Sequence, residues 1–272
     1  MTEICRSLKF QRSRYYRQCL QKPIDAEAVK LKAKVAQIHH EMHQTYGSRR
    51  MQAELNAQGF LLGRYKVRRI MKALSLKAKR PKQHRYPLIG QSSAIAPNYL
   101  NRQFNPTQSN SHWSGNITYI RTGQGWLYLA IVLDLYSRRV IGWVFSSQPN
   151  SELSTHALQL AVQHRRPEHP VLFHTDQGVQ YSSDQFQRSL RTHGITASMS
   201  RRGNCLDNAV TERFFRSLKT ERVNNRQYKT RQEAMQDIAE YIEPFYNQIR
   251  RHSTLGNLSP AEYEQKCQTN LR

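Results

Sequence analysis

Three side chains with oxygen atoms lie at positions where an acidic metal ligand would be expected. Asn116 lies in HWSGNITYI, Asp176 in FHTDQGVQY, and Glu212 in NAVTERFFRSLK. Each occurs at a predicted strand end or on a predicted helix face. Carboxylate oxygens are the ligands that hard divalent cations such as Mg²⁺ prefer. The first of the three is an amide, so this residue decides whether the chain does chemistry or only holds its substrate.

The charge of the chain indicates a polyanionic partner. Its 272 residues contain 42 Lys and Arg against 19 Asp and Glu, which gives a net charge of +23 and a pI near 10.3. A field of this strength favours nucleic acid, and the alternative is a basic protein whose charge serves only solubility. The charge is concentrated at the start, with +16 in residues 1–100 and +7 in residues 101–272.

Membrane insertion, export and a disulfide framework are not expected. The sequence has no run of 18 apolar residues and no signal-peptide core at its N-terminus. The four cysteines are scattered and form no CxxC pair, which is typical of free thiols in a reducing cytoplasm.

A basic segment rich in Pro and Ser, residues 77–98, divides the chain. We predict a helical region over 1–76, a linker over 77–105, a catalytic core over 106–225 and a helical extension over 226–272. Apolar residues at helical spacing predict three short helices within 27–74, in the manner of a helix-turn-helix. A basic three-helix bundle with a solvated face is the alternative. The predicted DNA contacts of this region are Arg49, Arg50, Tyr65, Arg68, Arg69 and Lys72.

The second half alternates strands and helices. Segments 117–122, 126–137 and 137–146 are rich in β-branched and aromatic residues and follow one another too closely for parallel pairing. Helices at 152–165 and 182–194 then alternate with strands at 170–176 and 195–200. This order predicts an α/β domain of the ribonuclease H-like kind, with a mixed five-stranded sheet and flanking helices. The three tryptophans (Trp113, Trp126 and Trp143) are expected in its core.

The three candidate ligands fall on different elements of that domain. Asp176 would end a strand, at the edge where open α/β sheets bind ligands, and Asn116 would begin the first strand. Glu212 lies on a helix over 207–221 and shares a face with Asn208, Arg216 and Lys219. An ordinary surface Glu–Arg pair is the alternative for Glu212. Asp134 also ends a strand, but it is predicted to form a turn or to pair with Arg138.

Seven segments, in this order, resemble the integrase-like transposases of bacterial insertion sequences, the family named after insertion sequence three, and in particular its second-reading-frame product. They are IHHEMHQTYGSRRM, GRYKVRRIM, WSGNITYI, GWLYLAIVLDLYSRRVIGW, HTDQGVQYSS, NCLDNAVTERFFRSLKTE and YNQIRRHSTLGNLSPAEY.

The resemblance implies a ribonuclease H-like fold and assigns Asp176 and Glu212 to the second and third positions of the DDE metal-binding triad. Asn116 then occupies the first position, and Lys219 matches a basic position that contacts DNA ends. It also implies two Mg²⁺ ions, which Mn²⁺ can replace, and double-stranded DNA, both terminal inverted repeats and target, as the substrate. The implied partners are further copies of the chain, as a dimer or higher oligomer on DNA, and an upstream-frame DNA-binding protein. The implied location is the bacterial cytoplasm, at the nucleoid.

The asparagine departs from the family pattern. An amide offers one neutral oxygen and cannot bridge two cations as a carboxylate does. We therefore predict a transposase that binds DNA but cleaves and joins strands poorly. The alternative is a DNA-binding regulator of transposition that needs no catalysis, and a simple ribonuclease H-like nuclease is a third, weaker option.

Overall fold

The computed structural model describes residues 25–79, 96–201 and 205–269, together with residues 7, 11 and 13. Much of the predicted linker, residues 80–95, lies outside the described residues, as does most of the basic segment before residue 25. In the parts that are described, no helix has both the length and the apolar character needed to span a membrane.

Three helices form the N-terminal unit, as the apolar spacing predicted: α3 (Ala26–Glu41), α4 (Ser48–Ala57) and α5 (Arg64–Ala73). The side chain of Asp25 caps α3 by accepting a hydrogen bond from the backbone N–H of Ala28. Each helix buries its apolar stripe against the other two, for example Val35 of α3 and Val67 of α5. The α4 helix has Gly47 at its N-cap position and no side-chain cap hydrogen bond.

A mixed sheet of five strands forms the centre of the second unit. The strands are β1 (His112–Thr122), β2 (Gly125–Asp134), β3 (Val140–Ser146), β4 (Leu172–Thr175) and β5 (Thr196–Met199), in the spatial order β3-β2-β1-β4-β5. The first three strands pair antiparallel, and β4 and β5 extend the sheet in parallel. This is the ribonuclease H-like arrangement that the sequence predicted.

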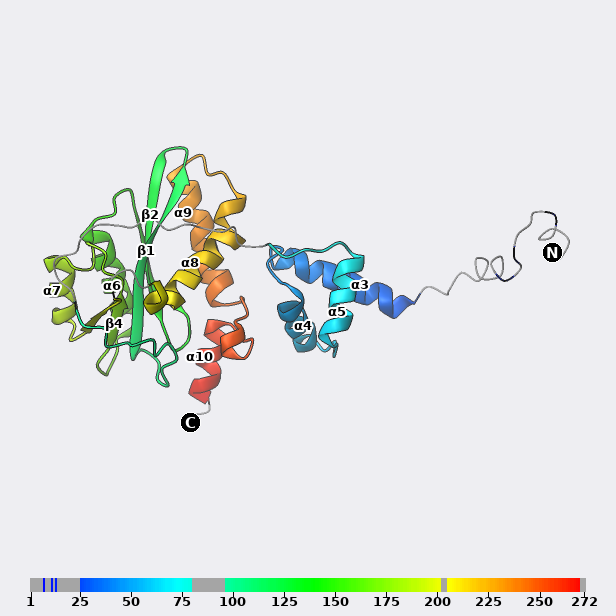
Figure 1. The fold of residues 1–272 in the computed structure, drawn as a ribbon, viewed down its shortest axis with the longest axis horizontal. Helices are drawn as coiled ribbons and strands as arrows, with labels where there is room; N and C mark the ends of the chain where they lie inside the picture. Colours follow the sequence, from blue (N-terminus) through cyan, green and yellow to red (C-terminus); the bar gives the residue numbers. More distant parts are fainter. Residues whose placement is uncertain are drawn as a thin grey trace.

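Helices cover both faces of the sheet (Figure 1). On one face, α6 (Ser151–Arg165) and α7 (Asp184–Thr192) bury their apolar side chains together with Trp113 and Phe173. The α6 helix approaches β3 so closely that a Cβ on Gly142 would lie 2.4 Å from the carbonyl oxygen of Ala157, so only glycine fits there. The other face is covered by α8 (Ala209–Glu221), which follows the 3₁₀ turn η1 (Cys205–Asn208), and by α9 (Arg231–Glu240).

The chain after α9 remains helical despite a proline. Pro244 lies inside η3 (Tyr241–Asn247), a π-helical stretch that directly continues α9. A proline inside a helix usually kinks or ends it, and here the structure shows a wider turn. Proline has no N–H to donate, and a π-helical turn is one way a helix accommodates an interrupted ladder. Short elements η4 (Ser253–Leu255) and α10 (Pro260–Thr269) complete the described chain.

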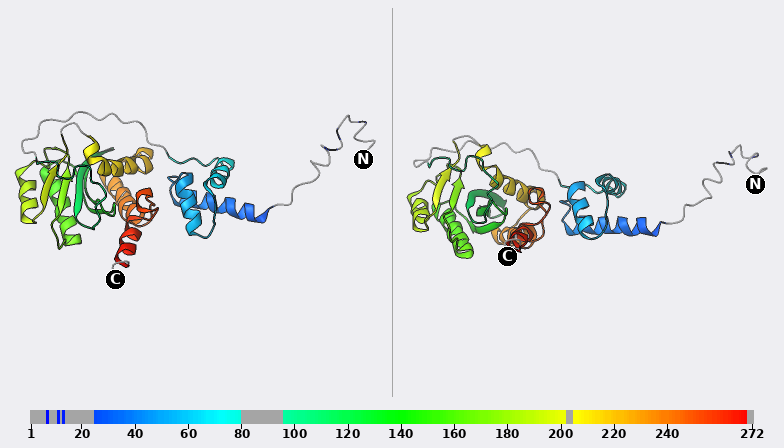
Figure 2. Two further views of the ribbon diagram at one scale, coloured as in Figure 1. Left: turned by 60° about the horizontal axis from the view of Figure 1, so that its bottom comes forward. Right: turned by 90° about the horizontal axis from the view of Figure 1, so that it is seen from below.

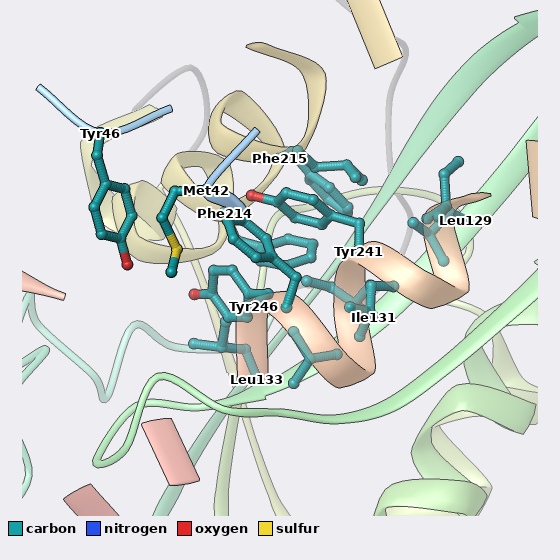
Figure 3. Close-up of a cluster of buried hydrophobic side chains, with 14 of the residues drawn as sticks. Met42, Tyr46, Leu129, Ile131, Leu133, Phe214, Phe215, Tyr241 and Tyr246 are labelled. Carbon is teal, nitrogen blue, oxygen red and sulfur yellow. The ribbon is translucent and has the colours of Figure 1, made fainter. Parts of the chain in front are cut away.

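The N-terminal unit packs against the C-terminal helices, on the side of them that is away from the sheet (Figures 1 and 2). One apolar cluster runs from Leu129 and Ile131 of the sheet through Phe214 and Tyr246 to the N-terminal helices. Figure 3 shows Met42 and Tyr46 at the N-terminal end of this cluster. Both α8, through Glu221, and η3, through Phe245, contact the N-terminal unit, and η3 also bonds to β3 through Asn247.

Candidate active site

Asn116 lies on β1, and Asp176 directly follows β4, the strand that pairs in parallel with the first part of β1. The register pairs His112 with Leu172, Trp113 with Phe173 and Ser114 with His174, so each β4 residue is numbered 60 above its β1 partner. Asp176 follows directly after β4 and stands in the same relation to Asn116. Adjacent strands are about 4.8 Å apart, so the two side chains are near neighbours. Asn116 lies in the middle of β1, and not at its start as the sequence suggested.

A chain of hydrogen bonds attaches the start of α8 to the same part of β1. The Thr211 hydroxyl donates to Ser114 Oγ at 2.7 Å, and Ser114 Oγ donates to Asn208 Oδ1 at 2.7 Å. Asn208 Nδ2 donates to the carbonyl oxygen of Gly115 at 3.4 Å. Side chains two residues apart on a strand share a face, so Asn116 faces α8 as Ser114 does. Glu212 follows Thr211 directly, so it lies at the part of the α8–β1 contact that is near Asn116.

Asp176 and Glu212 lie near enough for the charge of one to act on the other. Burial raises the pKa of Asp176, and a hydrogen bond of 3.0 Å from the N–H of Gly178 partly opposes this shift. Burial also raises the pKa of Glu212, and the negative charge of Asp176 raises it further, while Arg216 acts in the opposite direction. The register of β1 with β4, the bond from Thr211 to Ser114 and this electrostatic interaction together place the three predicted ligands near one another.

The donor set fits a divalent cation incompletely. Within the described parts of the chain, neither Asp176 nor Glu212 forms a salt bridge, and carboxylates are the ligands that a divalent cation prefers. Asn116 adds a neutral amide whose oxygen accepts a 2.7 Å hydrogen bond from the N–H of Ile117. No cluster of three His, Cys, Asp or Glu side chains suited to a metal occurs among the described residues. Two carboxylates and one amide would hold a cation more weakly than three carboxylates.

Asp134, the other strand-end carboxylate, has a structural role. It is fully buried and accepts hydrogen bonds from the N–H groups of Tyr136 and Asn110 at 3.0 and 3.2 Å. Its carbonyl oxygen accepts from the N–H of Arg138 at 2.8 Å. The bonds from Tyr136 and Arg138 close the turn after β2, as the sequence suggested, and the bond from Asn110 attaches the segment before β1.

The predicted DNA contacts of the N-terminal unit divide into two groups. On α5, Tyr65 is 75% exposed, and its neighbouring cations Arg68, Arg69 and Lys72 are also exposed. Arg49 of α4 is exposed as well. Arg50 is half-buried instead, and its guanidinium lies 3.4 Å from the Glu221 carboxylate. Arg50 thus forms an ion pair within the molecule and does not have the exposed position that is expected of a DNA contact.

The predicted contacts on the second unit also differ among themselves. Asn208 is only 3% exposed because it binds β1, so it positions α8 and does not face solvent. Arg216 is exposed beside Glu212. Lys219 is half-buried, and its ammonium lies 4.8 Å from the ring centroid of Tyr119; burial lowers its pKa.

Sequence reasoning missed the side chains that position the site. Ser114 and Thr211 are both buried and carry the link between β1 and α8. The available signal was a small hydroxyl residue two positions before Asn116 and another directly before Glu212. Such residues in otherwise apolar elements are usually hydrogen-bonded when buried.

Known protein families and relatives match nearly the whole chain. Residues 106–205 and 193–260 match families described as integrase core domain, and residues 26–84 match an HTH-like domain. The insertion element IS600 uncharacterized 31 kDa protein of Shigella sonnei is 38% identical over 97% of this chain and 98% of its own length. Transposase InsF for insertion sequence IS3A of Escherichia coli is 36% identical over 97% of this chain and 93% of its own length. A simian T-cell lymphotropic virus intasome structure matches with a TM-score of 0.47 and 20% identity, covering 84% of this chain and 73% of that one.

Proposed function

Because the chain belongs to the family of insertion-sequence transposases that includes InsF of IS3, we propose that it binds the terminal inverted repeats of its element and is built to cleave and transfer DNA strands with a divalent metal. The observation that carries this proposal is the convergence of Asn116, Asp176 and Glu212 from β1, β4 and α8. Strand cleavage and strand transfer are both in-line displacements at phosphorus, so one site serves both steps.

The residues have separate tasks in this proposal. Asp176 and Glu212 would hold the metal, Mg²⁺ by preference, which would activate the attacking oxygen and stabilise the leaving oxygen. Arg216 binds a phosphate of the substrate near Glu212. The exposed α5 face, with Tyr65 and Arg68, binds duplex DNA through the phosphates and the major groove. Two DNA ends must be held together for transposition, so at least two copies of the chain assemble on DNA.

Asn116 limits the chemistry of this chain. The site lacks the negative charge of a third carboxylate, so it would attract a divalent cation more weakly. The chain therefore binds DNA but cleaves it poorly. This same amide favours a second function, a regulator that occupies the terminal repeats without cutting them.

The Asn116→Asp variant tests the catalytic proposal. Cleavage of duplex DNA carrying the ends of the element is measured with Mg²⁺ or Mn²⁺. We expect a gain of more than about 100-fold, since even loss of a group that only orients a metal ligand costs about 10- to 100-fold. The double variant Asn116→Asp/Glu212→Gln is the matched control and should be inactive. Specific binding to the ends with no cleavage by Asn116→Asp would favour the regulator.

A further inference from the structure

Two large aromatic side chains are exposed where β1 and β2 meet at their hairpin. Tyr119 is 44% exposed and Trp126 is 46% exposed, so the expectation that Trp126 belongs to the core is wrong. Their ring centroids are 5.2 Å apart and the rings are nearly perpendicular, at 88°. The register pairs Tyr119 with Tyr128 and Arg121 with Trp126, so these side chains share one face of the sheet.

This part of the sheet is not covered by the helices that cover the rest of that face. The α6 helix packs on β2 and β3 around Ala130 and Gly142, nearer the other end of the hairpin. The β4 strand pairs with β1 only as far as Ser114. Tyr119 and Trp126 therefore lie beyond both elements, which leaves the rings open to solvent.

Cations connect this aromatic pair to the candidate active site. Lys219 holds its ammonium 4.8 Å from the Tyr119 ring centroid, and Arg121 is exposed opposite Trp126. Lys219 also lies on α8 seven residues after Glu212, which is two turns, or about 10 Å, along the helix. Arg216 is exposed on the same side of α8, between the two. Glu212, Arg216 and Lys219 thus share one side of α8, and Lys219 reaches from it to the Tyr119 ring.

We propose that Tyr119 and Trp126 form a stacking platform for unpaired bases of a DNA strand whose backbone passes Glu212, with Lys219 and Arg121 contacting its phosphates. The inference rests on the proposed function and adds single-stranded DNA to the substrate that the site accepts. Exposed aromatic rings flanked by cations bind single strands without sequence preference, because every base has a face that can stack.

A second copy of this chain is the competing occupant of the exposed rings. The charges argue against it, since each copy has a net charge of +23 and the platform itself is flanked by two cations. A polyanion complements this surface, whereas another strongly basic protein would be repelled from it.

The test uses the full chain and two fluorescein-labelled probes, an oligodeoxythymidine of about 15 nucleotides and a duplex of the same length. Binding is followed by anisotropy across a range of salt concentrations. We expect Trp126→Ala and Tyr119→Ala each to weaken single-strand binding by about 5- to 100-fold. Their salt dependence should be unchanged because no phosphate contact is removed. Duplex affinity should also be unchanged, and Trp126→Phe should recover most of the single-strand affinity.

Two further measurements guard against simple misfolding of the hairpin. The oligodeoxythymidine should quench the tryptophan fluorescence of the parent chain, and this quenching should be lost in Trp126→Phe, which keeps the buried Trp113. Ile249→Ala removes an apolar side chain of similar exposure, 47%, far along the sequence from the platform, and should bind both probes as the parent does.

The inference is overturned if the alanine variants bind the single strand as tightly as the parent. It is equally overturned if Trp126→Ala alters only the oligomeric state in sedimentation, because the rings would then contact a second copy. If Asn116→Asp cleaves DNA and the platform variants bind normally, this inference alone fails. If Asn116→Asp does not cleave while platform binding behaves as expected, the catalytic proposal alone fails.

Discussion

Thr211 of α8 donates a hydrogen bond to Ser114 of β1 with 2.7 Å between the two buried hydroxyl oxygens. The bond joins the residue before Glu212 to the strand that carries Asn116. It fixes the position of the first turn of α8 on the sheet, and therefore the distance between Glu212 and Asn116. Hydroxyl groups do this better than apolar contacts because their hydrogen bonds are directional.

Thr211→Val should test that link, because valine keeps the volume of threonine and removes the donor. We expect a loss of about 1 kcal/mol in the free energy of unfolding, measured in urea. In the Asn116→Asp background we also expect slower DNA cleavage, since Glu212 is no longer held in place. Thr211→Ser keeps the hydroxyl and is the control. Equal cleavage by the valine and serine variants would show that this bond does not position Glu212.

Asp176→Asn should stabilise the fold when no divalent metal is present. Burial raises the pKa of Asp176, so the folded carboxyl ionises at higher pH than the unfolded one, and its contribution to stability falls as pH rises through the carboxyl range. The isosteric amide removes that cost, and we expect a gain of about 1 kcal/mol at neutral pH, as is common where function opposes stability.

Thermal unfolding with chelator measures this gain, and added Mg²⁺ should stabilise the parent more than the variant. Glu168→Gln removes one negative charge at an exposed position and controls for the change in net charge. A variant less stable than the parent in chelator would mean that the carboxylate is not an electrostatic burden in the empty site.

The sequence was sufficient for the elements but not for every boundary. Apolar spacing predicted α3, α5 and α6, because one buried face of a helix leaves a regular pattern. The start of β1 was missed because its first residues include serine, glycine and asparagine, which have low strand propensity. There the strand exists because β2 and β4 pair with it on both sides. Pairing of this kind is a tertiary effect that local sequence does not record.

Only part of the candidate site could be predicted from the sequence, because some of its features depend on tertiary packing. Asp176 and Glu212 stand in recognisable segments, whereas the exposure of Trp126 depends on how far α6 extends over the sheet. Arg50 pairs with Glu221, 171 positions away in the sequence. An arginine that was predicted to bind DNA therefore forms an ion pair within the molecule. Such long-range ion pairs follow from packing and leave no local pattern.

Glu221→Gln should destabilise the chain strongly. Two nitrogens of Arg250 donate to the Glu221 carboxylate at 2.7 and 2.6 Å, and the Tyr241 hydroxyl donates at 2.7 Å. Burial raises the pKa of Glu221, but the arginine charges outweigh it and hold the pKa below its usual value. Replacing one partner leaves the other charge buried and unpaired, at a cost of about 3–5 kcal/mol.

Chemical unfolding at neutral pH measures that cost. Because the folded pKa of Glu221 is lowered, its stabilising effect is present above the usual carboxyl range and is lost as pH falls through it. The difference between parent and variant should therefore shrink in acid. Glu240→Gln is the control, since Glu240 is exposed and lies 3.9 Å from Arg222. A loss no larger than that of the control would contradict the role of this ion pair.

His252→Gln should flatten the dependence of stability on pH below neutrality. The imidazole Nε2 lies 3.2 Å from Arg250 Nη1, and its ring packs against Tyr246 with centroids 4.9 Å apart. Burial lowers the pKa of His252 well below 6.5, and so do the charges of nearby arginines: Arg250, Arg50 and Arg138. The unfolded chain therefore takes up a proton near pH 6.5 that the folded chain refuses, so stability falls as pH decreases. One such proton contributes about 1.4 kcal/mol per pH unit.

Urea unfolding at several pH values between 5 and 7.5 measures the slope, with the exposed His156→Gln as control. If both variants keep the slope of the parent, His252 takes up its proton in the folded state and its surroundings are not as basic as the structure indicates.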